Sequence, residues 1–357
     1  MPVVGVWVAV LTLIAVPAFA DDVYVSTEGS GAVYRVRVLG GAAVEKVGQF
    51  AGLNRPIATI EADATGKMWA FGGSEIGVLD LKTGETKAVA CDGVMGFGGA
   101  SAISADGKFL YAQATLNGAN GEWGVVFDTE TLTQRLKIDP ASAATYCAAF
   151  SADSGGILYW WQGKVWRKPV AGGEAAATGD APGSTVISMG PSQDGSVLVY
   201  TEAADGAGVD IFEVAADGCR LVARADKVPS SARPFRYNAR QRFFFYQTKV
   251  RQIFCYDTTS KATAKWAAEF SEAAPAEFFT KRADGAVLLD GREFKEESAV
   301  FTDQTMVPGT AQALLVLSRG YRYPGYVAAW DAEKQAWGGA VRLEGGGLTK
   351  VVMGKRG

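Results

Sequence analysis

Short apolar runs alternate with polar turns along most of the chain. Phe109-Leu110-Tyr111 follows the turn Ser104-Ala105-Asp106-Gly107-Lys108, and an Asp-Gly pair between apolar runs is the strongest short-range signal of a β-hairpin. Related turns precede other apolar runs, with their third residues at 63, 106, 153, 194, 240 and 284. The steps between these positions are 41 to 47 residues. A period of this length built from strands predicts the blades of a β-propeller.

A second kind of turn lies between these units and starts with an aspartate at the end of an apolar run. Its aspartates are Asp80, Asp128, Asp257 and Asp331. An Asp side chain in a reverse turn hydrogen-bonds its own backbone. Each period therefore predicts four strands: an inner strand, the Asp-Gly turn, a second strand, a variable loop, a third strand, the second turn and an outer strand. We expect an all-β protein made of four-stranded blades.

The number of blades follows from the third strands, which we expect near residues 32, 76, 124, 165, 210, 252, 293 and 326. This count favours eight blades. Because residues 293–306 are only weakly apolar, seven blades with one elaborated member is the alternative. The tail 348–353 is a lone predicted strand, and we expect it to supply the inner strand of the first blade and close the ring. Residues 21–357 are then a single propeller domain.

The unit Ser104-Ala105-Asp106-Gly107-Lys108 followed by Phe109-Leu110-Tyr111, together with Pro56 and Pro234 upstream of inner strands in other blades, resembles bacterial YVTN-type and WD-like propeller repeats. The resemblance covers nearly all of the chain after residue 20. It implies a fold and no particular activity, because propellers carry many functions. The signature Tyr-Val-Thr-Asn itself is missing, and Tyr24-Val25-Ser26-Thr27 is the nearest match.

Residues 1–20 are uncharged and apolar, and they end in Ala18-Phe19-Ala20. Small residues at Ala18 and Ala20 form the pattern that signal peptidase recognises. We therefore expect a signal peptide cleaved after Ala20, a periplasmic or secreted protein, and no membrane span after cleavage. An uncleaved anchor helix is the alternative.

The composition of the chain excludes several classes of catalytic and metal site. The chain has 357 residues, a net charge of −3 and no histidine. Without histidine, Ser-His-Asp and Cys-His catalysis and His-ligated metal sites are excluded. The slightly acidic charge, without any basic block, argues against nucleic acid as a partner. Glycine-rich phosphate loops and Asp-rich calcium loops are not present in the sequence either. We therefore predict no cofactor and no metal.

Four cysteines would enter an oxidising compartment: Cys91, Cys147, Cys219 and Cys255. They contain no Cys-x-x-Cys pair, so neither a zinc site nor a thioredoxin-type site is indicated. Disulfides could pair them in three ways.

Function in a propeller is expected at the central tunnel and at one face. We call this face the loop face; it carries the loops between second and third strands and the connections between blades. Arg55 and Arg233 each precede a proline in a connection into an inner strand. They could hold an anionic ligand between them through the donors of their guanidinium groups. The alternative is that each pairs with a neighbouring carboxylate or carbonyl.

The most unusual loop of this face is Arg319-Gly320-Tyr321-Arg322-Tyr323-Pro324-Gly325-Tyr326. Tyrosine and arginine dominate binding hot spots, so Arg319, Tyr321, Arg322 and Tyr323 are candidate partner-binding residues. The alternative is that the tyrosines cover the edge of a neighbouring blade. Trp160 and Trp161 lie on one strand, and alternation predicts that one faces between blades and the other faces outward or toward the next loop.

These observations predict an exported, non-catalytic binding propeller whose loop face meets a protein, a peptide or a glycan. The competing class is an enzyme or enzyme subunit, such as a lactonase-like hydrolase or the propeller subunit of a periplasmic redox enzyme. A structural surface-layer component is a third alternative.

Overall fold

The computed structural model describes residues 23–27, 29–37, 43–54, 56–63, 65–138, 148–180, 186–191, 197–206, 208–215, 218–226, 233–234, 243–247, 253–257, 262–265, 279–289, 291–293, 300–306, 312–318, 325–331, 333–334, 336–343 and 348–353. The described residues form strands and turns and contain no helix. Their strands make seven four-stranded sheets and one three-stranded sheet, all antiparallel.

Four sheets are built from strands of the first part of the chain, and the first of them also contains the C-terminal strand. The first sheet contains β3 (Ala43–Gln49), β2 (Ala32–Arg37), β1 (Val23–Thr27) and β31 (Leu348–Met353). The second contains β4 (Ile57–Ala62), β5 (Lys67–Gly72), β6 (Glu75–Asp80) and β7 (Thr86–Ala90). The third contains β8 (Val94–Ile103), β9 (Phe109–Leu116), β10 (Glu122–Asp128) and β11 (Gln134–Ile138). The fourth contains β12 (Ala148–Phe150), β13 (Gly156–Trp161), β14 (Lys164–Pro169) and β15 (Ala176–Asp180).

Four more sheets follow. The fifth contains β16 (Val186–Pro191), β17 (Val197–Glu202), β18 (Gly208–Ala215) and β19 (Gly218–Asp226). The sixth contains β20 (Arg233–Pro234), β21 (Phe243–Gln247), β22 (Ile253–Asp257) and β23 (Ala262–Lys265). The three-stranded sheet contains β24 (Phe279–Lys281), β25 (Val287–Leu289) and β26 (Arg292–Glu293). The last sheet contains β27 (Val300–Met306), β28 (Gln312–Ser318), β29 (Gly325–Asp331) and β30 (Ala336–Leu343).

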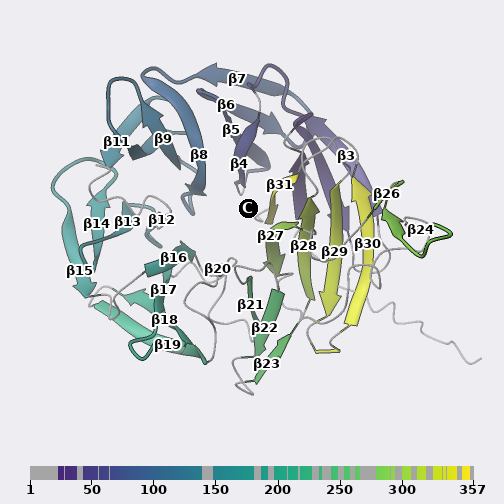
Figure 1. The fold of residues 1–357 in the computed structure, drawn as a ribbon. Coiled ribbons are helices and arrows are strands. Elements are labelled where there is room, and N and C mark those ends of the chain that lie inside the picture. The colour runs from purple at the N-terminus through teal and green to yellow at the C-terminus, as the bar shows by residue number, and fades with distance from the viewer. Residues whose placement is uncertain are drawn as a thin grey trace, which may run out of the picture.

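The four-stranded sheets are arranged around a common centre (Figure 1). Their inner strands contact one another in the order β27, β31, β4, β8, β12, β16 and β20. In the view of Figure 1 the three-stranded sheet lies at the periphery, beyond the outer strands. This radial arrangement is the one that the repeating strand pattern predicts.

A strand lies at each of the eight places where the sequence predicts a third strand. The seventh of them, Arg292–Glu293, belongs to the peripheral three-stranded sheet, so the choice between eight blades and seven with one elaborated member stays a prediction. The tail strand β31 pairs with β1 as the fourth strand of the first sheet. Residues 1–22, which contain the predicted signal peptide, lie outside the described residues.

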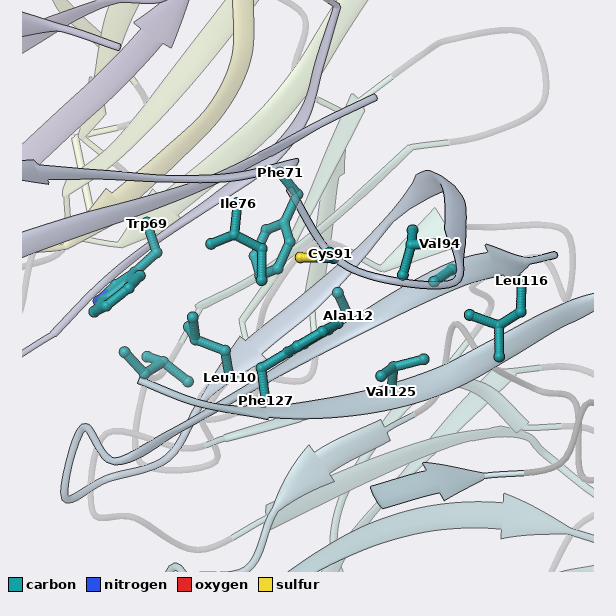
Figure 2. Packing of buried hydrophobic residues seen from close by; sticks show 12 residues of the cluster. Trp69, Phe71, Ile76, Cys91, Val94, Leu110, Ala112, Leu116, Val125 and Phe127 are labelled. Atoms are coloured by element: carbon teal, nitrogen blue, oxygen red, sulfur yellow. The ribbon is translucent and has the colours of Figure 1, made fainter. Parts of the chain in front are cut away.

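The core consists of separate apolar clusters, each enclosed between two successive sheets. Clusters of this kind lie between the last and first, first and second, second and third, third and fourth, and fourth and fifth sheets. Figure 2 shows the cluster between the second and third sheets, in which Trp69 and Phe71 face Leu110 and Phe127. The first four sheets are thus buried on both faces, and this explains why their inner and middle strands are rich in consecutive apolar residues.

The expectation for Trp160 and Trp161 is wrong in one respect. Trp160 packs against the cluster between the fourth and fifth sheets, and Trp161 packs against the cluster between the third and fourth. Trp161 also lies beside Trp166, with ring centroids 5.4 Å apart. Both tryptophans therefore face between blades, on opposite sides of one sheet, because a neighbouring sheet packs against each face.

Cys91 belongs to the cluster between the second and third sheets and is a buried, free thiol. Burial raises its pKa to about 11, which disfavours the reactive thiolate form at neutral pH. Cys147 and the side chain of Cys255 lie outside the described residues.

The predicted aspartate turns are present and follow two recurring patterns. After inner strands, Oδ1 of the aspartate accepts the N–H two residues ahead, at Asp63, Asp106, Asp153 and Asp284. After third strands, Oδ1 accepts the N–H groups two and three residues ahead, at Asp80, Asp128 and Asp331. Both kinds of turn lie at the same end of the sheets, because Thr129 N–H donates to the carbonyl of Lys108. The loop face is the opposite end.

Candidate functional site

Most of the residues that the sequence predicts for binding are not among those that the structure describes. Arg55, Arg319, Tyr321, Arg322 and Tyr323 lie outside the described residues. The backbone of Arg233 begins β20 and pairs with Gln247 in β21, whereas the Arg233 side chain is not among the described ones. Their predicted roles therefore stay predictions.

The connection that precedes Pro56 is fixed against the loop face of the second sheet. The N–H of Asn54 donates to the Glu75 carboxylate at 2.8 Å. A Cβ at Gly72 would lie 2.2 Å from the carbonyl oxygen of Asn54, so only glycine fits at this position. The link therefore enters β4 along a defined path beside the turn between β5 and β6.

The most irregular described element is the inner strand β8 of the third sheet. In its pairing with β9, Phe97 is opposite Ala114 and Ser101 is opposite Ala112. Gly98, Gly99 and Ala100 therefore lie opposite the single residue Gln113. Bulges of this kind leave residues outside the strand ladder and are frequent next to functional sites. We call residues 98–100 the β8 bulge.

The Gln113 side chain supports the β8 bulge from behind. Gln113 is fully buried, and its Nε2 donates to the Glu122 carboxylate on β10. A Cβ at Gly98 would lie 2.7 Å from Gln113 Oε1 and 2.9 Å from its Cδ. The absence of a Cβ at Gly98 therefore lets the backbone approach the buried amide this closely. The bulge, the amide and the carboxylate form one connected unit across three strands.

Ser101, directly after the bulge, takes part in a hydrogen-bond chain between two sheets. Its Oγ donates to Glu61 Oε1 at 2.7 Å and lies 2.6 Å from Thr59 Oγ1. A hydroxyl has one proton to donate, so Thr59 donates to Ser101. Thr59 and Glu61 are 0% and 5% exposed, whereas Ser101 is partly exposed. Two buried polar residues of β4 thus orient the Ser101 hydroxyl.

An aromatic cluster holds the bulge on its other side. Phe97, the residue before the bulge, contacts Phe71 edge-to-face with centroids 5.1 Å apart. It contacts Phe127 in the same way at 5.9 Å. Phe97 itself stays partly exposed, while Phe71 and Phe127 are buried and point toward one another from the second and third sheets in Figure 2. Packing of these three rings therefore fixes the position of β8 next to the bulge.

Sequence reasoning missed the β8 bulge, although a signal for it exists. Gly96, Gly98 and Gly99 lie within six residues of one predicted strand, and glycine inside a strand marks a bulge or a close backbone approach. No signal could have identified the partners, since Thr59 and Glu61 are 42 and 40 residues from Ser101.

Within the described part of the chain, no group of three or more His, Cys, Asp or Glu side chains is arranged to hold a metal ion. The described ranges likewise contain no helix long and apolar enough to cross a membrane.

Comparison with known proteins bears on the fold. No protein-family model matches the sequence, and no curated protein matches it. A structure of the dihydro-heme d1 dehydrogenase NirN in complex with DHE is similar over 92% of this chain and 74% of that chain, with a TM-score of 0.51 and 12% identity.

Two further structures are similar at lower scores. A nidogen/laminin complex aligns over 69% of this chain and 92% of that chain, with a TM-score of 0.46 and 11% identity. A mitotic checkpoint complex aligns over 82% and 76%, with a TM-score of 0.47 and 12% identity. Together with the radial four-stranded sheets, the likeness to NirN shows that the chain is a β-propeller protein.

Proposed function

We propose that the chain is an exported, non-catalytic binding propeller whose loop face meets a protein, a peptide or a glycan. The observation that carries this proposal is the β8 bulge. There, the buried Gln113 side chain lies against Gly98, and buried Thr59 and Glu61 of the second sheet hold the Ser101 hydroxyl. Bulges are over-represented next to functional sites, so this break in the repeat marks the inner strand of the third sheet as a candidate place for binding.

The absence of histidine from the sequence supports a binding role over acid–base catalysis at neutral pH. The loop 319–326 supports a partner at the loop face, because its arginines and tyrosines have the composition of a binding surface. The apolar segment 1–20 and its Ala18-Phe19-Ala20 ending support export.

Capture of partners by the immobilised protein tests the binding role. Peptide, glycan and protein arrays are probed with the wild type and with the triple variant Tyr321→Ala, Arg322→Ala, Tyr323→Ala. The triple variant should lose the binding that the wild type shows. Leu221→Ala is the matched control, since Leu221 is a 53% exposed apolar residue of the outer strand β19. Equal capture by the wild type and the triple variant, with both folded, would contradict the proposal.

Export is tested by N-terminal sequencing. The N-terminal residue of protein recovered from the periplasm or medium should be Asp21. Recovery of chains that retain residues 1–20 in the membrane fraction would show an anchor instead.

The second candidate is the propeller subunit of a periplasmic redox enzyme. The likeness to the NirN structure over most of this chain favours it, as an analogy of fold alone. A lactonase-like hydrolase belongs to the same competing class. Visible absorption of the protein purified from the periplasm, and lactone hydrolysis by it, separate both enzymes from the binding propeller.

A further inference from the structure

The outer strands of the four-stranded sheets differ in how regular their free edges are. Five of these outer strands carry one residue that is skipped in the pairing with the third strand. The skipped residues are Val47 on β3, Arg135 on β11, Thr178 on β15, Val222 on β19 and Gly338 on β30. A bulge twists the strand and interrupts the row of outward backbone groups, so a bulged edge is a poor template for another strand.

The outer strand β7 of the second sheet has a regular edge. Its five residues pair with β6 without a shift, whereas β23, the other regular outer strand, pairs over four residues. β7 is the last strand of its sheet, and Figure 1 shows it at the rim of the molecule. From outside that sheet, no described residue forms a backbone hydrogen bond with β7. The second sheet therefore presents a continuous free edge.

The hydrogen-bond register shows which groups of β7 point outward. The N–H of Asp80 donates to the carbonyl of Glu85, just before β7 begins. In antiparallel strands, hydrogen-bonded pairs alternate with non-hydrogen-bonded pairs, so residues 87 and 89 direct their N–H and C=O groups at β6. Thr86, Ala88 and Ala90 direct theirs away from the sheet. N–H donors and C=O acceptors therefore line this edge at regular spacing.

The side chains of β7 indicate which kind of strand fits beside it. Ala88 packs against the cluster between the first and second sheets, so alternation places Lys87 and Val89 on the opposite face. Lys87 is exposed, and Val89 is partly exposed. Lys87 forms no ion pair with any described residue. An added strand with an acidic residue beside Lys87 and an apolar residue beside Val89 matches these positions.

A second copy of this chain matches the edge less well than a peptide does. Antiparallel pairing of β7 with itself about Ala88 places Lys87 opposite Val89 and gives the ammonium group no anion. Five residues on each side are also far fewer than the roughly 20–30 residues a side of a stable interface. A short extended peptide needs no larger surface, because main-chain hydrogen bonds supply its affinity and alternate side chains its specificity.

We propose that the edge of β7 binds an extended peptide segment of a partner protein, which adds a fifth strand to the second sheet. The segment carries an acidic residue two positions from an apolar one. Its backbone pairs with Thr86, Ala88 and Ala90, and its carboxylate lies beside Lys87, which disfavours basic strands. This edge lies on the rim and not on the loop face, so the inference goes beyond the proposed function and does not depend on it.

Synthetic peptides test this inference on the full-length exported protein. The probes are seven-residue peptides of the pattern Gly-X-Val-X-Glu-X-Gly, with Thr, Val or Ser at X, and the matched peptides carry Lys in place of Glu. Calorimetry measures binding, and amide hydrogen exchange of residues 86–90 reports its place. Glu peptides should bind and slow exchange at Thr86, Ala88 and Ala90. The Lys peptides should bind about fivefold more weakly, as expected for an exposed ion pair.

Two variants of β7 test the backbone pairing and the charge. Ala88→Pro removes an outward N–H without removing a hydrogen bond to β6, and it should weaken binding about tenfold. Lys87→Glu should reverse the preference, so that Lys peptides bind about fivefold more tightly than Glu peptides. Lys137→Glu is the matched control, because Lys137 is an exposed lysine on the bulged outer strand β11, and it should bind like the wild type. If Ala88→Pro does not fold by circular dichroism, Lys87→Glu decides alone.

The outcomes separate this edge from the loop face. The inference is overturned if no peptide slows exchange at residues 86–90, or if the folded β7 variants bind and discriminate the peptides as the wild type does. Self-association that Ala88→Pro abolishes, without peptide binding, overturns it in favour of a second copy. The triple variant at residues 321–323 should retain the Glu peptides. If the loop face binds nothing while β7 binds these peptides, the proposed function fails and this inference stands.

Discussion

The turns after the inner strands of the second, third and fourth sheets are built alike. In each, an aspartate carboxylate accepts the N–H two residues ahead, at Asp63, Asp106 and Asp153. The inner strands themselves are not alike. The pairing of β4 with β5 shifts around one residue, Ala58, whereas β8 contains the bulge 98–100 opposite Gln113.

The difference separates scaffold from site. A turn that is repeated in several sheets has the same structural role in each: it reverses the chain and satisfies its N–H groups. Among the described strand pairings, three residues opposite one occur in β8 alone, where Gly98 lies against buried Gln113 and Ser101 bonds across to the second sheet. Features that break a repeat without a local need are where binding is expected.

The largest effect is expected among the repeated turns, at the one that is most buried. Asp63 is 4% exposed, and its Oδ2 accepts from the indole of Trp69 at 3.0 Å. Asp63→Ala leaves that buried N–H without an acceptor and removes the turn hydrogen bonds, so the free energy of unfolding should fall by about 3 kcal/mol. Denaturant unfolding measures this.

Asp284→Ala is the control for that loss. Asp284 makes the same turn hydrogen bond but is exposed, so its loss should be clearly smaller. Equal losses would mean that the turns contribute through the shared hydrogen bond alone, and that the burial of Asp63 adds nothing.

The inner strands offer a matched pair of glycines. Gly98→Ala should lower the free energy of unfolding by about 1–3 kcal/mol, because its Cβ would collide with the buried Gln113 amide. No described atom lies within 4 Å of a Cβ built at Gly190 on β16. Gly190→Ala should therefore be neutral or stabilising by about 0.5 kcal/mol. Similar effects of the two substitutions would remove the distinction between β8 and a regular inner strand.

The smallest effect is expected in the loss of stability at acidic pH. The N–H of Thr131 and then the Arg135 guanidinium lower the pKa of Asp128 to about 2. An unfolded aspartate has a pKa of about 3.9, so the stabilisation from Asp128 is complete above that value and disappears as the pH falls toward 2. Asp128→Asn should therefore destabilise the protein at pH 7 and flatten its loss of stability between pH 5 and 2. A variant whose acid transition parallels the wild type would exclude this contribution.

Much of the fold could be predicted because turn chemistry is local. The aspartate turns at 63, 106 and 153 and the third strands were located from residue type and spacing alone. Trp160 and Trp161 show the limit of local reasoning. Alternation correctly placed them on opposite faces of β13, but only the packing of neighbouring sheets decides that both faces are buried.

The sequence by itself determined that strands and turns repeat with a propeller period, since each turn satisfies its hydrogen bonds within a few residues. It also determined that histidine chemistry is absent. Only the tertiary structure decided which polar groups meet. Ser101 reaches Thr59 and Glu61 across about one full repeat of sequence, because the inner strands of neighbouring sheets lie side by side. That contact depends on how two sheets pack, and no spacing along the chain encodes it.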